Sequence, residues 1–575
     1  MSTSTSLPDL AVTRRLPNIF DLVALICIVG ALIAVARGAS GTFAPLSALD
    51  VTPIRLDASA LPGYALRTTL RMFAALAASL LFTFTFAPLA AKSRRAGLVM
   101  IPLLDILQSV PILGFLSFTV VFFMSLFPGQ VLGAELAAIF AIFTSQAWNM
   151  AFSLYQSLVT VPEDLAEAAR SFRLSAWQKF WRLEVPFAMP GLVWNTMMSM
   201  SGGWFFVVAS EAISVGDTNW RLPGIGSYVA AALEARDLSA VVWAIVAMLV
   251  VILAYDQLLF RPLTAWSAKF RVELTQGAQA EDPWMLAMLR RTHLLRQAVD
   301  ALGVGFNIVT GLRLSVGKRR ARAPGPPSRL LDAVWIVALL GLAGLIVWRL
   351  FGFLVAGLAW SDLGEAVLLG MITLLRVAVL MVAASLLWVP VGVWLGLRPA
   401  WARRAQPVAQ FLAAFPANLF FPPVVMGIVA FHLTPDIWLT PLMVLGTQWY
   451  ILFNVIAGAA AFPGDLQEAS RSFHIGGWLW WRRVIIPGIF PYYVTGAITA
   501  SGGSWNAAIV AEVASWGDTK LTAHGLGAYI AQATEAGDTA RIVLGVVVMS
   551  LFVVLFNRLL WRPLYAYSTR RLAIS

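Results

Sequence analysis

Two pairs of ionisable residues lie inside long apolar stretches, where oppositely charged side chains could pair. Arg71 and Glu211 belong to the first half of the 575-residue chain, and Arg376 and Glu512 occupy comparable positions in the second half. Charged groups are costly inside a membrane and are usually paired or functional. We therefore predict two structural ion pairs, Arg71–Glu211 and Arg376–Glu512. The alternative places Glu211 and Glu512 on a polar path through the membrane, where two carboxylates would suit an anion poorly.

A polar segment occurs twice in the chain, at an offset of 301 residues. Residues 162–190 read PEDLAEAARSFRLSAWQKFWRLEVPFAMP, residues 463–491 read PGDLQEASRSFHIGGWLWWRRVIIPGIFP, and twelve positions match without a gap. The pattern predicts short amphipathic helices at 163–176 and 464–477, each starting after a proline and carrying acidic residues in its first turn. Pro186 and Pro190 are expected to break the chain before the next span. The duplication indicates two equivalent docking points for a soluble partner.

The chain lacks recognisable catalytic machinery. Gly317-Lys318 resembles part of a phosphate loop, but Arg319 stands where Ser or Thr is required and position 312 is not glycine. The single Cys27 excludes a disulfide framework or a cysteine metal site. The four histidines are scattered without metal-ligand spacing: His293, His432, His474 and His524. We expect no catalytic residue, metal or cofactor in this chain.

The composition is that of a membrane protein with many spans. Hydrophobic residues make up 59% of the chain and charged residues only 12%, whereas soluble domains carry about 25% charged residues. The net charge of +12 is explained by the excess of Lys and Arg in cytoplasmic loops, so no nucleic acid is expected as a partner. A span needs roughly 20 apolar residues. About twelve spans are predicted, near 19–36, 64–90, 97–127, 133–158, 191–215, 238–260, 331–355, 365–396, 406–432, 437–461, 492–516 and 541–561.

The basic residues predict the orientation of these spans. Basic clusters stand before the first span, between the second and third, between the fourth and fifth, and after the sixth. All fall on one side, which the positive-inside rule makes cytoplasmic. The N-terminus, both duplicated segments and the central linker are therefore expected in the cytoplasm. The first apolar run lacks a convincing cleavage site and is interpreted as a retained span.

The repeat extends over both halves and defines the predicted domains. SGGW (201–204) corresponds to SGGSW (501–505), and GDT recurs at 216–218 and 517–519. Paired glycines permit close helix packing, which is the commoner explanation, or free backbone groups to line a cavity. The domains are 1–264 and 331–575, joined by a basic linker, 265–330. The candidates for a translocation path are Ser201, Gly202, Gly203, Trp204, Ser501, Gly502, Gly503, Trp505 and Asn506, with Glu211 and Glu512 as the alternative to ion pairing.

The linker is the one long segment that is not membrane-like. Its basic residues include Arg290, Arg291 and Arg296. A patch around Trp284–Leu295 could form an amphipathic helix at the membrane surface. A simple tether and a regulatory site both remain open as its role.

The duplicated segment resembles the EAA loop of type I ABC importer permeases. That pattern is Glu-Ala-Ala, a glycine six residues after the glutamate and a proline nineteen after it. The chain has Glu167-Ala168-Ala169 with Pro186, and Glu468-Ala469-Ser470 with Pro487. Arg173 and His474 replace the customary glycine. Because the resemblance covers both halves, it implies an all-α membrane protein built as two tandem six-helix permease domains.

The resemblance also implies partners and contact residues. In that family the loop carries a coupling helix, which sits in a groove of an ATPase subunit. Two cytoplasmic ATPase copies, which bind ATP and Mg, and a periplasmic solute-binding protein are implied, with the chain in the bacterial inner membrane. The coupling residues carried over are Asp164, Glu167, Ala168, Ala169, Phe172, Arg173, Asp465, Glu468, Ala469, Ser470, Phe473 and His474.

The substrate is less well defined by the sequence. The glutamate, the GDT segment and the Gly-Leu-Gly-Ala-Tyr-Ile stretch (525–530) are similar to the nitrate/taurine/bicarbonate-type branch, which implies a small polar or anionic solute. Iron(III) and thiamine importers also include fused permeases. A twelve-span secondary transporter also has two parallel halves but would not need duplicated EAA-like helices. A membrane enzyme would need a catalytic cluster at one membrane face, and none is visible in the sequence.

Overall fold

The computed structural model describes residues 18–39, 41–47, 54–215, 218–270, 284–312, 329–460, 462, 464–516 and 519–568. The chain divides into two compact units. Unit 1 comprises Met1–Arg37, Val161–Pro190 and Asp256–Lys318, and unit 2 comprises Gly38–Thr160, Gly191–Tyr255 and Arg319–Ser575.

The first half of the chain is helical apart from one β-hairpin. Its elements are α1 (Ile19–Ala39), α3 (Leu61–Lys92), α4 (Arg94–Ser109), α5 (Ile112–Leu126), α6 (Val131–Val159), α7 (Glu163–Ser171), α8 (Ala176–Lys179), α9 (Val185–Glu211), β1 (Ala212–Val215), β2 (Thr218–Arg221), α10 (Ile225–Glu234), α11 (Leu238–Tyr255) and α12 (Arg261–Ser267). The linker then contributes α13 (Trp284–Arg291) and α14 (His293–Gly311).

The second half repeats this order. Its elements are α15 (Arg329–Gly357), α16 (Trp360–Gly396), α17 (Pro399–Ala414), α18 (Phe421–Ala430), α19 (Pro435–Trp438), α20 (Leu442–Leu445), α21 (Trp449–Ala460), α22 (Gly464–Ser472), α23 (Gly477–Trp480), α24 (Ile486–Ala511), β3 (Val513–Trp516), β4 (Thr519–Thr522), α25 (Leu526–Glu535), α26 (Thr539–Phe556) and α27 (Arg562–Tyr567).

The described residues contain eight helices long and apolar enough to cross a membrane, or up to ten if each of two bent pairs counts as one span. The predicted span near 97–127 is broken in the structure, because α4 and α5 meet at a bend of 96°. The predicted span 406–432 is likewise divided into α17 and α18. Both breaks lie at a proline, where the preceding residue, Val110 or Phe415, is extended. A residue before proline is disfavoured in the α conformation, so Pro111 and Pro416 each end a helix.

Pro186 and Pro190 do not break the chain as expected, and Pro190 lies inside α9. Four prolines that leave the helix unbroken share one local structure. Each follows a five-residue π-helical turn by two positions: the turns are Phe180–Glu184, Asp256–Phe260, Trp481–Ile485 and Asn557–Trp561, and the prolines are Pro186, Pro262, Pro487 and Pro563. Proline has no amide hydrogen, and its ring clashes with the carbonyl four residues earlier. A π turn widens the helix at that point, so the chain accommodates the proline and continues as a helix.

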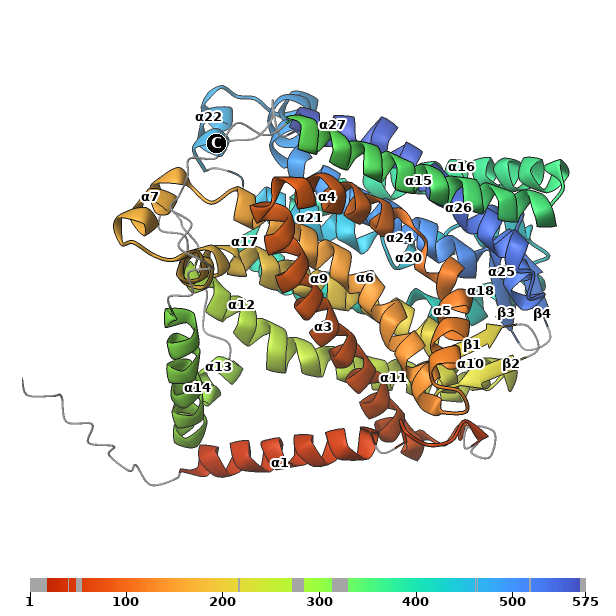
Figure 1. The fold of residues 1–575 in the computed structure, drawn as a ribbon, viewed down its shortest axis with the longest axis horizontal. Helices are drawn as coiled ribbons and strands as arrows, with labels where there is room; N and C mark the ends of the chain where they lie inside the picture. The colour runs from red at the N-terminus through yellow and green to blue at the C-terminus, as the bar shows by residue number, and fades with distance from the viewer. Residues whose placement is uncertain are drawn as a thin grey trace, which may run out of the picture. The chain divides into compact units, whose positions relative to one another are not determined.

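The predicted spans 191–215 and 492–516 both extend too far. Their last residues form strands of two antiparallel hairpins, β1–β2 and β3–β4, with Ala212 opposite Arg221 and Val513 opposite Thr522. The hairpins and the short helices α10 and α25 gather at one end of unit 2, and α22 lies at the other end (Figure 1). The tips of both hairpins, where Gly216-Asp217 and Gly517-Asp518 were noted, lie outside the described residues.

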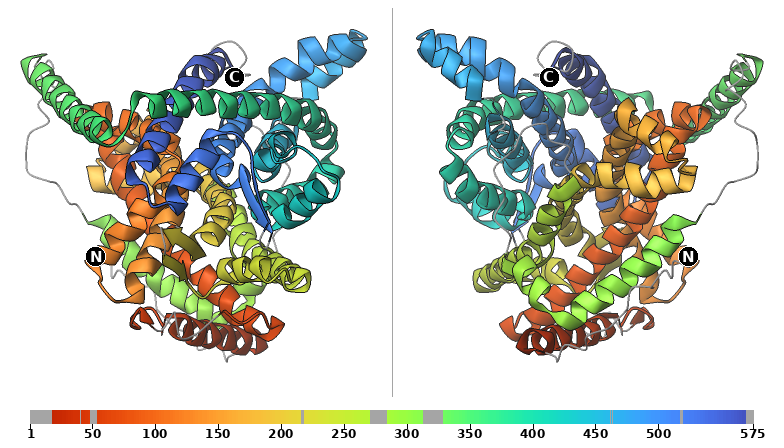
Figure 2. Two further views of the ribbon diagram at one scale, coloured as in Figure 1. Left: turned by 90° about the vertical axis from the view of Figure 1, so that its right-hand side faces the viewer. Right: turned by 90° about the vertical axis from the view of Figure 1, so that its left-hand side faces the viewer.

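The two halves share one core within unit 2. Helix α5 from the first half packs against α24 and α26 from the second half. At the start of α5, the amide of Ile112 donates to the Asn506 carboxamide oxygen on α24 at 2.6 Å. Helix α15, in contrast to α5, is exposed. It projects outward from unit 2 (Figure 2), and its apolar window is not buried.

Candidate functional site

The first duplicated loop, in unit 1, folds as a short helix with a defined end. Helix α7 ends at Ser171, five residues before the predicted end at 176. Arg173 has a φ of +50°. Its amide donates to the Arg170 carbonyl at 2.9 Å, and the Leu174 amide donates to the Ala169 carbonyl at 3.1 Å. This bond pair defines a Schellman motif, which places its C′ residue in the left-handed region and normally uses glycine there.

The second loop, in unit 2, ends its helix in the same way. His474 has a φ of +53°, its amide donates to the Arg471 carbonyl, and the Ile475 amide donates to the Ser470 carbonyl at 2.9 Å. Arg173 and His474 therefore adopt the backbone conformation that a glycine would favour at the same place. The replacement of glycine leaves the shape of the turn unchanged and adds strain of the left-handed kind.

The exposed and buried residues of the two loops correspond. Phe172 and Phe473 are each 77% exposed, whereas the small residues Ala169 and Ser470 are buried. The Glu167 side chain is 71% exposed, and its ion pair is with Arg170 on its own helix, at 3.5 Å. Ala168, Ala469, Glu468 and Asp164 are also exposed, whereas the side chain of Asp465 lies outside the described ones. In Figure 2 the segment around α22 and α23 projects from unit 2.

The loop segment that follows α7 is stabilised by its own cap. The Ser175 hydroxyl accepts from the Gln178 amide at 3.2 Å, and the Gln178 side chain accepts from the Ser175 amide at 3.0 Å. This reciprocal pair is a capping box and starts α8. The π turn Phe180–Glu184 then leads into α9 without interruption. Each loop thus joins directly to a long helix.

The first charged cluster within unit 2 contains three ionised side chains. Arg71 on α3 contacts Glu211, the last residue of α9, through Nη1 and Oε1 at 2.7 Å. It also binds Glu135 on α6 in a bidentate pair, with Nε–Oε2 at 2.6 Å and Nη2–Oε1 at 2.7 Å. Arg71 and Glu211 are nearly inaccessible to solvent. Paired guanidinium and carboxylate groups of this geometry bond strongly.

The second cluster repeats the arrangement with weaker geometry. Arg376 on α16 contacts Glu512 at 3.2 Å and Asp436 on α19 at 2.9 Å. The Asp436 side chain is 36% exposed, and it also accepts from the backbone amide of His524 at 2.6 Å. Each arginine therefore meets the glutamate that the sequence paired with it, together with a second carboxylate that the sequence analysis did not include.

Each glutamate also forms hydrogen bonds with two neighbouring helices at the hairpin end of unit 2. The Glu211 carboxylate accepts from the Thr68 hydroxyl at 2.7 Å and from the Gly226 amide at 2.6 Å, at the start of α10. Glu512 accepts from the Thr373 hydroxyl and from the Ala528 amide in α25. A helix N-terminus presents free amides and a positive dipole end to an anion. Glu211 and Glu512 thus lie at the C-terminal end of one helix and accept hydrogen bonds from amides in the first turn of the next.

This arrangement explains the paired glycines of the two Gly-x-Gly segments. A Cβ at Gly224 would overlap the Glu211 carboxyl group, and one at Gly226 would overlap the carbonyl of Val208. Gly525 and Gly527 stand in the same relation to Glu512 and Ala508. Only glycine lets the helix start lie this close to the carboxylate.

The residues missed by the sequence analysis carried a signal in the repeat. Glu135 and Asp436 are separated by the same offset of 301 residues as the two EAA loops, and Thr68 and Thr373 each stand three residues before the paired arginine. A search for acidic residues that match at the 301-residue offset would therefore have identified the third charged residue of each cluster.

The translocation-path candidates separate into different environments. Ser201, Gly202 and Gly503 line a small cavity in unit 2. The cavity also receives the hydroxyl-bearing side chains of Thr447 and Tyr450. It is enclosed by α9, α17, α20, α21 and α24, so both halves contribute to it. Neither Glu211 nor Glu512 is among its lining residues.

The remaining candidates pack against protein. A Cβ at Gly203 would lie 2.9 Å from the Gln146 amide nitrogen, whereas Gly502 faces open space. Trp204 stacks on Tyr255, and Trp505 stacks on Phe552. Both indoles are buried. Ser501 is buried too, and Asn506 accepts from Ile112 as described above.

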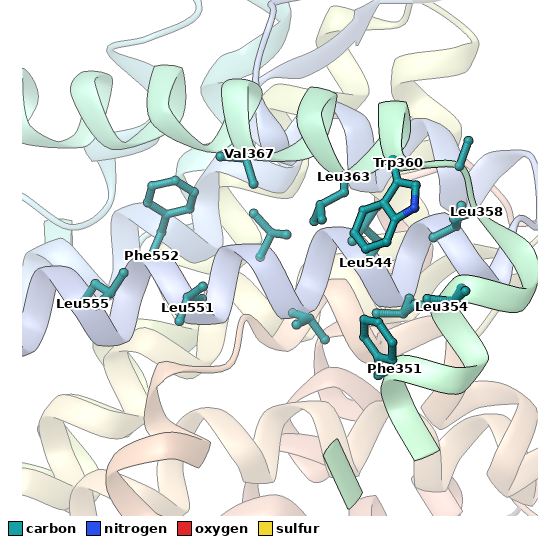
Figure 3. A pocket seen from close by; sticks show the side chains of 14 residues that line it. Phe351, Leu354, Leu358, Trp360, Leu363, Val367, Leu544, Leu551, Phe552 and Leu555 are labelled. Atoms are coloured by element: carbon teal, nitrogen blue, oxygen red, sulfur yellow. The ribbon is translucent and has the colours of Figure 1, made fainter. Parts of the chain in front are cut away.

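A larger groove of about 1140 Å³ lies among α15, α16 and α26 (Figure 3). Its lining is apolar and aromatic throughout, with Phe351, Leu363 and Phe552 among the side chains that point into it. It contains no charged or hydroxyl group for a polar solute. Such a surface suits hydrocarbon, which is the usual surrounding of a membrane span.

The fold and these sites define a multi-pass membrane protein made of two homologous halves, each with an exposed loop at one end of a long helix. The family model described as "Binding-protein-dependent transport system inner membrane component" matches residues 61–260 and 388–572. The two matches cover more than half of the chain and one lies in each half. The chain therefore belongs to this family.

Several characterised proteins are similar to one region of the chain. The nitrate import permease protein NrtB of Leptolyngbya laminosa is 25% identical over 187 residues, covering 32% of this chain and 63% of the relative. The bicarbonate transport system permease protein CmpB of Synechococcus elongatus is 27% identical, covering 36% and 68%. The glycine betaine/proline betaine permease ProW of Salmonella typhimurium is 31% identical, covering 24% and 36%. The chain thus spans about two thirds or less of each relative.

Proposed function

We propose that this chain is the membrane-spanning permease of an ATP-driven importer, with both permease domains on one polypeptide. The observation that carries the proposal is the pair of short loop helices, α7 and α22. Each helix is followed by an exposed phenylalanine, Phe172 or Phe473, which stands three residues after a buried small residue, Ala169 or Ser470. An aromatic anchor of this kind fits a pocket on a partner protein. Two matched anchors call for two copies of the partner.

In this proposal the partner is a cytoplasmic ATPase subunit, which binds ATP and Mg. The N-terminus, both loops and the linker lie in the cytoplasm of a bacterial cell, and the chain crosses the inner membrane. The hairpins with α10 and α25 face a periplasmic solute-binding protein. Closure of the ATPase pair moves α7 and α22, and the π turns pass this motion to α9 and α24. The central pathway then alternates between the two sides.

The proposed substrate is a small polar or anionic solute. Two of the relatives named above are permeases for nitrate and bicarbonate. The cavity between the halves has Ser201, Thr447 and Tyr450 as its hydroxyl-bearing lining residues and no ionised side chain. Hydroxyl groups can donate to an anion without holding it as tightly as a charge. Carboxylates would repel an anion, and Glu211 and Glu512 lie outside this lining.

Two alternatives lead to different measurements. A twelve-span secondary transporter is not favoured by the family, and its transport would be insensitive to the ATPase. An importer for iron(III) or a thiamine-like solute would also depend on the ATPase, but it would not take up an anion such as nitrate. Uptake of labelled nitrate, bicarbonate and taurine into vesicles, with and without internal ATP, separates these cases.

The docking proposal is tested by co-expressing the chain with a nitrate-type ABC ATPase subunit. Phe172→Ala and Phe473→Ala remove the proposed anchors, and Phe431→Ala is the matched control because Phe431 is 76% exposed but lies outside both loops. Truncation of an anchor typically costs about 2 kcal/mol, or about 30-fold in affinity. We expect two ATPase copies per wild-type chain by native mass spectrometry, and full binding by the control. Unchanged binding by the double anchor variant would contradict the proposal.

A further inference from the structure

The linker helix α14 in unit 1 presents an uncovered apolar face. Val299, Leu302, Phe306 and Val309 recur at spacings of three or four residues, which places them on one side of the helix. All four are at least half exposed, and Leu302 is 74% exposed. Arg296, Asp300 and Asn307 occupy the other side by the same spacing. Val304 and Ile308 are also more than half exposed but fall outside this face, so the polar side is a narrow stripe and the apolar surface is the broader one.

The start of α14 is attached to the first residues of a membrane span. Asn18, which immediately precedes α1, donates from its side-chain amide to the Arg291 carbonyl at 2.8 Å. The Arg291 guanidinium lies over the Phe20 ring, 5.9 Å from its centroid. Helix α1 begins at Ile19 and is apolar enough to cross a membrane. The junction of α13 and α14 thus lies at the N-terminal end of α1.

The end of α14 is attached to the first EAA loop. The Trp177 indole donates to the Val309 carbonyl at 2.9 Å, and the Gln178 side chain donates to the Gly311 carbonyl at 2.8 Å. Phe306 also meets the Trp181 ring edge-on, with centroids 5.5 Å apart. At about 1.5 Å per residue, the 19 residues of α14 bridge about 28 Å between these two attachments.

The second loop lacks a helix of this kind among the described residues. Trp478, which corresponds to Trp177, is 73% exposed. Together with Trp481 it lines an open apolar groove of about 1070 Å³ in unit 2. The contacts to α14 are therefore a property of the first loop and do not follow from the repeat.

We propose that α14 lies on the cytoplasmic surface of the bilayer as an interfacial helix and holds the first EAA loop at that level. Three observations favour lipid as the occupant of its apolar face. Arg291, which ends α13 just before α14, contacts the start of α1, which is apolar enough to cross a membrane. Helix α14 runs across the direction of α1 within unit 1 (Figure 1). The exposed Arg291 and Arg296 can reach anionic headgroups. Amphipathic helices with basic residues on the polar side bind membrane surfaces in this way.

The test uses the full chain in vesicles of phosphatidylglycerol and phosphatidylethanolamine. Cys27 is first replaced by serine, and single cysteines are then introduced by Leu302→Cys on the apolar face and Asp300→Cys on the polar face as the matched control. Both sites are exposed, so neither change disturbs packing. Each cysteine is labelled with an environment-sensitive dye, and phospholipids with a nitroxide on the acyl chain serve as quenchers.

The proposal expects at least twofold stronger quenching at position 302 than at 300, and slower reaction of the unlabelled 302 cysteine with a membrane-impermeant maleimide. Equal quenching and equal reactivity at the two positions would overturn it. Addition of the ATPase subunit provides a second arm. If position 302 is shielded only when that subunit is bound and is not quenched by the lipid, the face belongs to a protein partner and the proposal is wrong. The readout requires no transport, so it is independent of the proposed function.

Discussion

The two charged clusters predict unequal sensitivity to the loss of their arginines. Arg71→Met would leave Glu135 and Glu211 without their shared cation in a site that is almost fully buried. Removing one partner from a buried ion pair typically costs about 3–5 kcal/mol. Arg376→Met removes the same side chain from the second cluster, where both contacts are longer and Asp436 is partly exposed and retains the His524 amide. We expect about 1–3 kcal/mol there, since the cost approaches that of a lost hydrogen bond.

The assay compares the two variants in the same detergent. Apparent melting temperature and the fraction of monodisperse protein after heating report the loss, and wild type and Arg67→Met, an arginine near the start of α3, serve as references. The Arg71→Met variant should be clearly less stable than Arg376→Met. Equal stability of the two variants, or the opposite order, would refute the reasoning from burial and bond geometry.

A charge swap between Arg71 and Glu211 would be a poor test of the predicted ion pair. The exchange would place a carboxylate at position 71, against Glu135, which binds both nitrogens on one side of the arginine. Like charges at this distance in a buried site repel strongly. Failure of the swap therefore cannot distinguish a structural pair from a path for substrate. Neutralising all three positions at once avoids this difficulty, because replacing a complete buried ion group is often nearly neutral.

Three further outcomes are expected. Gly226→Ala and Gly527→Ala should lower the yield of folded protein, because a Cβ would overlap backbone, whereas Gly502→Ala should be tolerated. Arg173→Gly and His474→Gly should change stability by no more than about 1 kcal/mol, since relief of left-handed strain is offset by a more flexible unfolded chain; a large loss would contradict the turn geometry. Hydrogen bonds from the Ser239 hydroxyl and the Ala240 amide hold the pKa of Asp237 below its usual value, so its stabilising effect is present above the ordinary pKa and is lost as the pH falls through the lower folded value. The stability difference between wild type and Asp237→Asn should therefore shrink below about pH 4, and a difference that grows on acidification would exclude this effect.

Much of the architecture follows from local patterns in the sequence. The repeat, the two loop helices and most spans could be found because apolar length and acidic first turns act locally. The repeat also singled out Ser201, Gly202 and Gly503, but their meeting with Thr447 and Tyr450 in one cavity could not be predicted, because it depends on how the two halves pack. Glu135 differs, because its match with Asp436 at the repeat offset is visible in the sequence, although its contact with Arg71 depends on the approach of α3 and α6.

Proline was the least predictable residue type. Pro111 and Pro416 end their helices, whereas Pro186 and Pro487 follow π turns within a continuing helix. The difference lies in whether the residues before the proline can widen the helix, which depends on the packing of neighbouring helices. Pro190 and Pro491 take a third form, because they lie inside α9 and α24 without ending the helix. Sequence alone does not indicate which of these forms a proline takes.

The carboxylate at the end of α24 has a mechanical consequence. Helix α24 is 26 residues long, so it extends about 39 Å, more than the roughly 30 Å thickness of a bilayer core. Its beginning adjoins the second loop, and its other end is fastened to α25 through the Glu512 carboxylate. The second loop, α24 and the hairpin end are thus joined directly to one another, with no irregular segment between them. Pro491 lies near the beginning of α24, where helices bend most readily, so a displacement of the loop should reach the hairpin end as a tilt of the helix beyond this proline.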